Sequence, residues 1–426
     1  MNMQNPLSHR ARQILEEAFR AAVAAAAPDV AMSKVLPPRP KGRVVVVGAG
    51  KAAAQMAEAL VNAWDGPLSG VVVTRTGHGV GCETGPIEVI EARHPTPDAA
   101  SEIAAARLFD AVSGLGPDDL VIALVSGGGS ALLCRPLPGL TLSDKQVMTQ
   151  ALLASGATIE EMNRVRQRLS GVKGGRLAQA AAPAKVVTLA ISDVPGDVAD
   201  IIASGPTVPT RASTETAEQI IARYRINTSP RVAKVLTTLA STPPRAAQLP
   251  GGAFHLIASP QKSLEAAAAV ARAAGVTPLI LSDRIEGEAR EAGRVLAAIA
   301  QSRPDQMLTT RPMLFLSGGE TTVTLGNTSG RGGPNGEFAL AAALALRGTK
   351  GVTGLAADTD GVDGSENNAG AFFDGATVER MIAVGIDPFE AMSQHDSWGA
   401  FSAIDQLFMT GPTGTNVNDF RGFLVD

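Results

Sequence analysis

A glycine-rich turn near residue 50 carries the first residues that could do chemistry. An apolar run at residues 43–47 predicts a buried strand, and Gly48, Gly50 and Lys51 follow it where a helix begins. Free backbone N–H groups and the helix dipole at such a junction attract an anion. A cation there opposes the dipole, so we expect Lys51 to serve an anionic ligand rather than to be an ordinary surface lysine.

The same turn also fits a dinucleotide site, which is the main alternative. Its glycines match the Gly-x-Gly-x-x-Ala pattern of dinucleotide-binding folds. However, the next predicted strand ends at Arg75, where an acidic residue would normally hold the ribose of NAD. Arg75 could instead contact the 2′-phosphate of NADP, so an NADP site stays open.

A second glycine run follows the predicted strand at residues 120–125 and precedes another helix. It consists of Ser126, Gly127, Gly128, Gly129 and Ser130. Consecutive glycines allow several backbone N–H groups to converge on phosphate or carboxylate oxygens. A tight turn with a serine cap needs fewer glycines, so we predict that this loop binds nucleotide phosphates.

Basic residues gather at the end of the helix predicted at residues 158–169. Arg164 and Arg168 lie one turn apart on the same face, and Lys173 follows the helix. Such a cluster suits a phosphorylated substrate or product. The helix dipole alone also favours cations near a C-terminus, so both interpretations stay open.

One carboxylate follows another predicted strand of the first half of the chain. Asp193 comes just after the strand at residues 185–191. At that position it could bind a metal ion or act as a general base. It could instead cap the turn that follows.

Three carboxylates lie close together after the strand predicted at residues 352–357. They are Asp358, Asp360 and Asp363. Their spacing does not match an EF-hand, because an apolar residue and an aspartate occupy positions that the motif reserves for other residues. We expect a Mg²⁺ ion bridged to phosphate oxygens, since Mg²⁺ typically takes one or two protein carboxylates and several waters.

Two more glycine runs lie in the last third of the chain. Gly318, Gly319 and Glu320 follow a predicted strand, and Arg331 lies within the second run, just before the helix at residues 336–346. We expect a hairpin-like pair of strands between the runs, and phosphate binding at both. An arginine among glycines has little apolar surface to cover, so we predict a functional role for Arg331.

Short apolar runs alternate with helical segments along the whole chain. Continuous Val, Ile and Leu runs are typical of parallel strands that are covered on both faces. We therefore predict an α/β protein with two three-layer α/β/α domains, at residues 1–240 and 253–426, joined by a Pro- and Gly-rich linker. We expect the first domain to be Rossmann-like and the active site to lie in a cleft between the domains.

Composition excludes several classes of partner. The 426 residues include 37 basic and 41 acidic side chains, a formal net charge of −4, which argues against nucleic acid or an anionic membrane. The two cysteines cannot form a disulfide framework, and the N-terminal residues do not resemble a signal peptide. We expect a cytoplasmic enzyme that acts on a small molecule, with a homodimer as a possible assembly.

Together these residues supply what phosphoryl transfer requires. Glycine-built anion sites, two cations and acidic strand ends provide positioning and charge neutralisation, which dominate that reaction. The chain lacks the Gly-x-x-x-x-Gly-Lys-[Ser/Thr] sequence of P-loop enzymes and the Gly-x-Ser-x-Gly sequence of α/β-hydrolases.

The motifs, in this order, resemble the class II glycerate kinases. The resemblance of the first half rests on Gly48-Ala49-Gly50-Lys51-Ala52, the run from Ser126 to Ser130, Asn163-Arg164-Val165-Arg166 with Lys173-Gly174-Gly175, and Ile191-Ser192-Asp193-Val194. The later part resembles their MOFRL domain through Ser317-Gly318-Gly319-Glu320-Thr321-Thr322, Asp358-Thr359-Asp360-Gly361 and Gly411-Pro412-Thr413-Gly414-Thr415-Asn416-Val417. The resemblance runs nearly from end to end.

The resemblance implies ATP- and Mg²⁺-dependent phosphorylation of D-glycerate, usually at the 2-hydroxyl, to give 2-phosphoglycerate. It implies that Lys51 and Arg331 are catalytic cations that bind the substrate carboxylate and the transferred phosphoryl group. Asp193 would be a base or a metal ligand. Asp358 and Asp360 would serve the metal or the substrate hydroxyl.

Two departures from the family pattern bear on substrate preference. Residues 334–336 read Pro-Asn-Gly where Arg-Asn-Gln is common, and residues 75–76 read Arg-Thr where Lys-Tyr is common. Relatives also carry the name hydroxypyruvate reductase, so an NAD(P)H-dependent reductase that uses the turn at residues 48–51 is the alternative function. A non-catalytic sensor of a small phosphorylated acid is a third.

Overall fold

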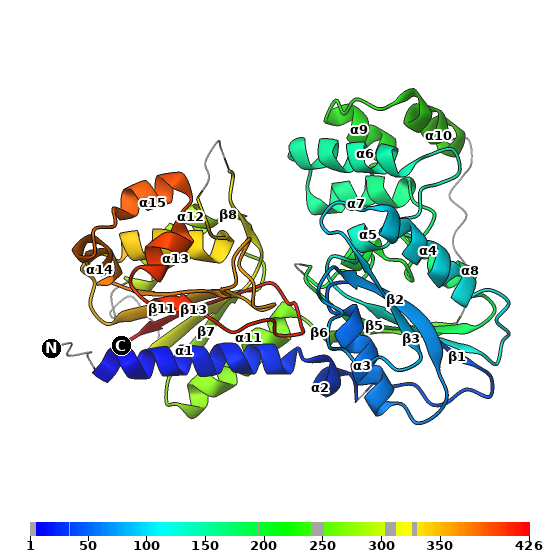
Figure 1. Cartoon of the computed structure of the whole chain (residues 1–426). Coiled ribbons are helices and arrows are strands. Elements are labelled where there is room, and N and C mark those ends of the chain that lie inside the picture. Colours follow the sequence, from blue (N-terminus) through cyan, green and yellow to red (C-terminus); the bar gives the residue numbers. More distant parts are fainter. Residues whose placement is uncertain (1–5, 34, 195, 241–250, 303–311, 326–329) are drawn as a thin grey trace. The chain divides into compact units, whose positions relative to one another are not determined.

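The computed structural model describes residues 6–33, 35–194, 196–240, 251–302, 312–325 and 330–426. The chain divides into two compact units (Figure 1). We refer to Pro28–Ile257 as the first domain and to Met1–Ala27 with Ala258–Asp426 as the second domain.

The first domain is built on a six-stranded sheet with the order β3-β2-β1-β4-β5-β6. Its strands are β1 (Val44–Ala49), β2 (Ser69–Arg75), β3 (Ile87–Ala92), β4 (Leu120–Val125), β5 (Lys185–Ile191) and β6 (Gly252–Ala258). The pairs β1–β2, β1–β4, β2–β3 and β4–β5 are all parallel. The strand order reverses at β1, as in a Rossmann-like fold, so this prediction is confirmed.

Helices cover both faces of this sheet. On one face lie α3 (Ala53–Ala63) and, beside it, α2 (Pro28–Met32). On the other face lie α4 (Ala99–Ala111), α5 (Gly129–Leu132) and α8 (Arg176–Ala180). Val45 and Val47 face the core under α4, whereas the buried Val46 between them faces the opposite layer.

Further helices of the first domain form a smaller cluster with its own apolar core. They are α6 (Leu142–Ala154), α7 (Ile159–Arg168), α9 (Ala217–Arg223) and α10 (Pro230–Ala240). Leu152, Val165 and Ile220 are buried between them. Figure 1 shows this cluster apart from the helices that flank the sheet. α7 also packs against a short 3₁₀ turn, η1 (Ile202–Ser204), which borders the candidate site.

The second domain contains a mixed sheet with the order β13-β12-β11-β14-β9-β7. Its strands are β7 (Thr277–Ser282), β9 (Met313–Ser317), β11 (Val352–Asp358), β12 (Gly370–Asp374), β13 (Leu407–Phe408) and β14 (Asp419–Val425). β7 and β9 are parallel, whereas β14 is antiparallel to both β9 and β11. The start of β14 therefore lies beside the ends of β9 and β11.

Helices also cover both faces of the second sheet, so the predicted three layers are confirmed. α1 (Pro6–Ala25) and α11 (Pro260–Ala273) pack on the face that carries Leu314 and Leu316, and α12 (Ala289–Ala300) and α13 (Pro334–Ala345) pack on the face that carries Phe315. α14 (Thr377–Ala383), α15 (Pro388–Gln394) and α16 (Ser397–Ser402) lie against α13. Within the described ranges, no helix is both long and apolar enough to cross a membrane.

The domain limits differ from the predicted ranges 1–240 and 253–426. α1 belongs to the second domain, because its Phe19 ring packs edge-on against Phe408 and Phe420. β6 instead completes the sheet of the first domain. An apolar stripe on a helix shows that the helix is buried, but not which sheet it covers.

The predicted hairpin-like pair between the later glycine runs is wrong. β10 (Thr321–Thr322) does not pair with β9 but pairs in parallel with β8 (Gly287–Glu288). The reason is that β9 already has β7 and β14 as neighbours, so it has no free edge for a hairpin partner.

Candidate functional site

The carboxyl ends of β1, β4 and β5 lie side by side, because these strands are neighbours in a parallel sheet. Gly48 lies within β1, and Gly50 and Lys51 follow it. The loop at residues 126–130 follows β4, and Asp193 follows β5. The strand order reverses at this point, which is where α/β folds bind ligands.

The first glycine turn uses its own backbone donors to hold the fold. The Gly50 N–H donates to Val73 O at 3.1 Å, and the Lys51 N–H donates to Gly127 O at 2.8 Å. The next N–H along the chain donates to the Oγ of the buried Ser126 at 3.1 Å. The first of these donors ties the turn to β2, and the other two tie the two glycine loops together, so none of the three is directed at an anion.

The second glycine loop retains donors of its own. Within the part of the chain that the structure describes, the N–H groups of Gly127 and Ser130 donate to no other protein group. A Cβ at position 127 would lie 2.0 Å from Asp193 Oδ2, so only glycine allows this loop and the carboxylate to lie so close. The loop is thus suited to receive phosphate oxygens.

Asp193 has an unusual electrostatic environment. Burial raises the pKa of Asp193, while the Lys51 ammonium and the N–H groups of residues 193 and 128 oppose that rise. The pKa of Asp193 stays above its ordinary value. A carboxylate with a raised pKa beside a cation is suited to accept a proton from a hydroxyl group.

His94 also borders this loop, although it was not among the predicted site residues. A Cβ on Gly128 would lie 3.1 Å from His94 Nε2 and 3.2 Å from Lys51 Cγ, so both side chains border the loop. Burial and neighbouring groups lower the pKa of His94 to about 4; the neighbours are Lys51, Arg75, His78 and Arg166. The loop therefore lies in positive surroundings, and the imidazole is neutral at neutral pH. Its position two residues after β3 was a signal that we could have used.

Lys173, which we predicted to bind phosphate, lies buried against the backbone of the loop. Its Nζ donates to Ser130 O at 2.6 Å and to Leu133 O at 3.0 Å. Burial lowers the pKa of Lys173 to about 7, and the cations Lys145 and Arg166 lower it as well. These contacts favour a role in holding the loop over a role as a phosphate ligand.

The predicted basic cluster on α7 is dispersed. Arg168 forms a salt bridge with Glu218, with 3.0 Å between Nε and Oε1, and the half-buried Arg164 shares its face of the helix. Arg166 lies on the opposite face and is the arginine of α7 whose charge reaches His94. Residues two positions apart lie on nearly opposite sides of a helix. Arg166 and the predicted Arg164 therefore belong to different faces of α7, and the predicted site changes with the arginine that is selected.

A chain of hydrogen bonds connects α7 to the second glycine loop. Ser130 Oγ lies 2.9 Å from Ser204 Oγ, and the Ser204 hydroxyl donates to Asn163 Oδ1 at 2.7 Å. Ser204 and Ala203 have φ values of 60° and 49°, in the left-handed region that non-glycine residues rarely adopt. Backbone strain of this kind gathers at functional sites, so we include η1 in the candidate site.

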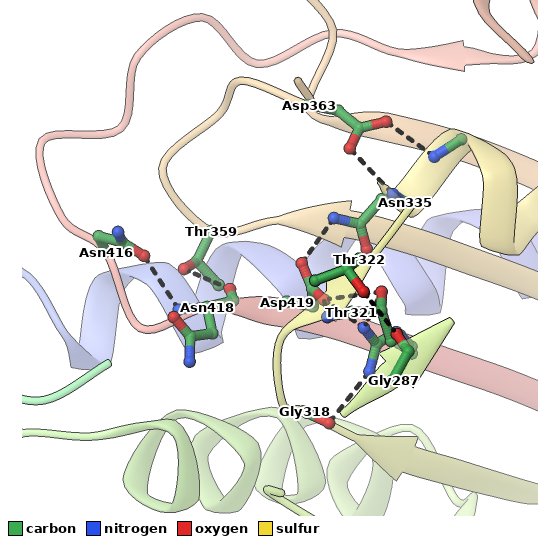
Figure 2. Close-up of polar contacts among 12 residues, drawn as sticks. Gly287, Gly318, Thr321, Thr322, Asn335, Thr359, Asp363, Asn416, Asn418 and Asp419 are labelled. Atoms are coloured by element: carbon green, nitrogen blue, oxygen red, sulfur yellow. Dashed lines mark hydrogen bonds and ion pairs between the residues drawn. The ribbon is translucent and has the colours of Figure 1, made fainter. Parts of the chain in front are cut away.

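A buried polar network supports the loop after β9 in the second domain (Figure 2). The side chain of Arg421 is completely buried and pairs with Asp419. Arg421 Nη1 donates to Gly318 O at 3.1 Å, and its Nη2 donates to Thr321 Oγ1 at 2.9 Å. Asp419 Oδ2 accepts from the Thr321 N–H at 3.1 Å. The network thus fixes both ends of this loop.

The three predicted phosphate-binding residues of this loop have different surroundings. The Gly318 N–H donates to Ser282 O at 2.8 Å. Gly319 has a φ of +113°, and a Cβ there would lie 2.2 Å from Ile285 O. The side chain of Glu320 is exposed. Close packing of the chain is therefore enough to explain the glycine at position 319.

Asn335 connects this loop to the glycine run that precedes α13. Its Nδ2 donates to Asp419 Oδ1 at 2.7 Å, as Figure 2 shows. The N–H groups of Asn335 and Gly336 donate to the two oxygens of Asp363 at 2.9 Å and 2.7 Å. Burial raises the pKa of Asp363 to about 7, and the charge of Asp419 contributes. Asp363 therefore binds the start of α13 and orients two loops.

Asp358 and Asp360 lie at the end of β11. Asp358 Oδ1 accepts from the Asp360 N–H at 2.9 Å, and Asp360 Oδ1 accepts from the Val362 N–H at 2.9 Å. Among the described residues, no group of three or more His, Cys, Asp or Glu side chains is arranged to hold a metal ion. Two carboxylates nevertheless match the usual protein share of a Mg²⁺ site.

Arg331 is exposed and lies between an acidic and an aromatic side chain. Its Nη2 and Nε lie 2.6 Å and 3.2 Å from the two carboxylate oxygens of Glu366. The guanidinium carbon lies 3.7 Å from the centre of the Trp398 ring. The Arg331 N–H donates to Asp396 Oδ1 at 3.2 Å, and its carbonyl accepts from the Trp398 N–H at 2.9 Å. The hydrogen bond to Glu366 raises the pKa of Arg331.

Two protein-family models match the chain. One, described as a domain of unknown function (DUF4147), covers residues 14–237, and the MOFRL family model covers residues 313–419. A D-glycerate 2-kinase from Thermotoga maritima is 41% identical over 96% of this chain and 97% of its own length. The chain belongs to the glycerate 2-kinase family.

The resemblance to glycerate kinases noted in the sequence is thus confirmed. The crystal structure of a glycerate kinase from Thermotoga maritima matches 98% of this chain and 100% of its own with a TM-score of 0.87 and 39% identity. A protein from Agrobacterium vitis named putative hydroxypyruvate reductase is 55% identical over 97% of this chain and 94% of its own length. Similar proteins of this glycerate 2-kinase family therefore carry two kinds of name, which only the chemistry of the site can separate.

Proposed function

We propose that this protein transfers a phosphoryl group from ATP to the 2-hydroxyl of D-glycerate. The observation that carries the proposal is the loop at residues 126–130, where the N–H groups of Gly127 and Ser130 donate to no other group among the described residues, and where Asp193 borders Gly127 and Lys51 borders Gly128. Donors, a cation and a carboxylate at one loop are what phosphoryl transfer to a hydroxyl requires.

Backbone donors and Lys51 would bind the phosphate oxygens. Among the described residues, the N–H groups of Gly127 and Ser130 have no other acceptor, and the Lys51 stem borders the loop. Preorganised donors and fixed charges stabilise the charge that develops during transfer without further reorganisation. The buried Lys173 amine would act indirectly, by holding the carbonyls of Ser130 and Leu133.

Asp193 would act as the general base. Its raised pKa brings it closer to the range in which a carboxylate can accept a proton from a hydroxyl during attack. Lys51 and the backbone N–H groups counteract part of that rise, because they favour the ionised form that can accept a proton. The close approach of Asp193 Oδ2 to Gly127 supports this role, because Gly127 belongs to the loop that we propose to bind phosphate.

Asp358 and Asp360 would hold the Mg²⁺ ion that accompanies ATP, with Asp193 as an alternative ligand. Their chemistry fits this ion, because carboxylate oxygens are its preferred protein ligands. One oxygen of each is oriented by a backbone N–H at 2.9 Å. When bound, Mg²⁺ would neutralise charge on the phosphate oxygens. Arg331 would provide a further cation for substrate or nucleotide oxygens.

The alternative is reduction of hydroxypyruvate with NAD(P)H. The name of the relative from Agrobacterium vitis and the first glycine turn both suggest it. However, the N–H groups of residues 50–52 are bonded to Val73, Gly127 and Ser126, so they do not offer the pyrophosphate site that a dinucleotide fold provides. The end of β2 also carries Arg75 in place of a ribose-binding carboxylate. We therefore favour the kinase.

A phosphorus NMR experiment tests the proposal directly. Purified protein is incubated with ATP, Mg²⁺ and D-glycerate, with a matched sample that lacks D-glycerate to detect ATP hydrolysis alone. We expect equal amounts of ADP and 2-phosphoglycerate. A resonance of 3-phosphoglycerate would correct the position of transfer. Oxidation of NADH by hydroxypyruvate, with no phosphoglycerate in the first sample, would contradict the proposal and favour the reductase.

A further inference from the structure

Glu366 makes the contact with Arg331 that an oxyanionic ligand would make. Two N–H groups of one guanidinium face the two oxygens of the carboxylate, at 2.6 Å and 3.2 Å. Arginine binds the carboxylate of a small acid, or two oxygens of a phosphate, through the same paired geometry. Glu366 and such a ligand therefore cannot occupy this edge of Arg331 together.

We propose that Glu366 is an internal competitor of the oxyanionic ligand of Arg331, and that ligand binding displaces it from the guanidinium. The inference deepens the proposed function and rests on it in one respect, namely that Arg331 contacts oxygens of the substrate or the nucleotide. Glu366 would then set the affinity of Arg331 for that ligand.

The surroundings of Arg331 allow this exchange. The Arg331 side chain is 53% exposed, so water screens the ion pair and an incoming anion can reach it. The backbone of Arg331 is held separately, by Asp396 and by the N–H of Trp398. The guanidinium also stacks on Trp398. Loss of the Glu366 contact would therefore leave Arg331 in place.

The position of Glu366 is also determined by the fold. Asp363 accepts from the N–H groups of Asn335 and Gly336 and is almost completely buried. These bonds join the loop that carries Glu366 to the loop that carries Arg331, three and four residues away from the ion pair. The ion pair between Glu366 and Arg331 is therefore formed by two loops that are anchored to each other.

The stacking on Trp398 provides a direct measurement of ligand binding. The sequence contains two tryptophans, Trp64 and Trp398. A Trp64→Phe parent therefore leaves Trp398 as the source of the tryptophan fluorescence. D-glycerate, ATP and inorganic phosphate are titrated separately, and the ligand that responds identifies the source of the oxyanion. We expect Glu366→Gln to lower its Kd about threefold, because the neutral amide competes poorly. Glu379→Gln, which removes the carboxylate of the exposed pair with Arg347, should leave the Kd unchanged.

A double-mutant cycle separates competition from a general effect of charge. In an Arg331→Met background, Glu366→Gln should leave the Kd unchanged, because the competitor has lost its site. An equal shift in that background would overturn the inference, as would identical affinities of the parent and Glu366→Gln for all three ligands. Tighter oxyanion binding by Glu366→Gln in a protein that forms no phosphoglycerate would contradict the proposed function and leave this inference standing.

Discussion

Asp193 Oδ2 lies so close to Gly127 that a Cβ on the glycine would be 2.0 Å away, although the two residues follow different strands. The proposed phosphate-binding loop and the proposed base are therefore positioned by one contact. A side chain at position 127 would move either the loop or the carboxylate, and both are needed in the proposed reaction.

Gly127→Ala should lower kcat roughly 100-fold, because displacement of reacting groups by about 1 Å has an effect of that size. This kcat is measured as the rate of ADP formation that depends on D-glycerate. Gly116→Ala is the matched control, since its Cβ would meet its nearest neighbour at 3.9 Å and should be tolerated. A variant at position 127 with normal turnover and an unchanged fold would remove the contact from the proposed mechanism.

Lys51→Met should lower turnover strongly while the protein stays folded. The lysine supplies the charge beside Asp193 and Gly128, and loss of one such stabilising group typically costs on the order of 100- to 1,000-fold in kcat. Circular dichroism checks the fold. Lys185→Met is the control and should retain activity. This lysine is exposed at the start of β5, so it lies at the opposite end of the strands from Lys51. Near-normal turnover of Lys51→Met would exclude the residue from the site.

Lys173→Met should change the pH dependence of stability. The pKa of Lys173 falls from 10.5 to about 7 in the folded protein. Between these values the unfolded chain binds more protons than the folded one, so the contribution of Lys173 to the free energy of unfolding rises with pH. The stability of wild type relative to Lys173→Met should therefore increase from pH 7 to about pH 10, as urea unfolding measures. Parallel curves would contradict this. Lys185→Met should follow wild type.

Asn335→Ala should destabilise the second domain. The buried Asp419 would lose the Asn335 Nδ2 donor at 2.7 Å, and a buried acceptor without its partner costs roughly 1–3 kcal/mol. Urea unfolding provides the measurement. Asn367→Ala, at an exposed position in the loop after Asp363, serves as the control and should change stability little. Equal effects of the two substitutions would argue against the network in Figure 2.

Strands with continuous aliphatic runs were predicted closely. β4 and β5 begin and end at the predicted residues, because continuous aliphatic runs bounded by polar residues leave little choice of limits. β14 was not predicted, although it is completely buried. Its Asp419 and Arg421 argue against a central strand when the sequence is considered alone, whereas in the structure they form an ion pair that makes the burial possible.

The candidate site was likewise predicted better in some parts than in others. Lys51, the loop at residues 126–130 and Asp193 lie together because each follows the end of a strand in one parallel sheet, and strand ends are predictable from the sequence. Lys173 and Arg164 depend instead on the direction of a helix face and of a long side chain, which only packing determines. His94 was interpreted as a polar loop residue and not as a site residue, because no glycine follows β3 to mark an anion site.

The packing of α1 has a consequence for synthesis on the ribosome. This helix emerges early, but α11 and the strands that it covers follow the entire first domain. Chains are made from the N-terminus at a limited rate. The apolar stripe around Phe19 therefore stays without its packing partners while more than half of the polypeptide is translated. The first domain can mature during elongation, whereas the second must assemble from two segments that flank the first domain in the sequence.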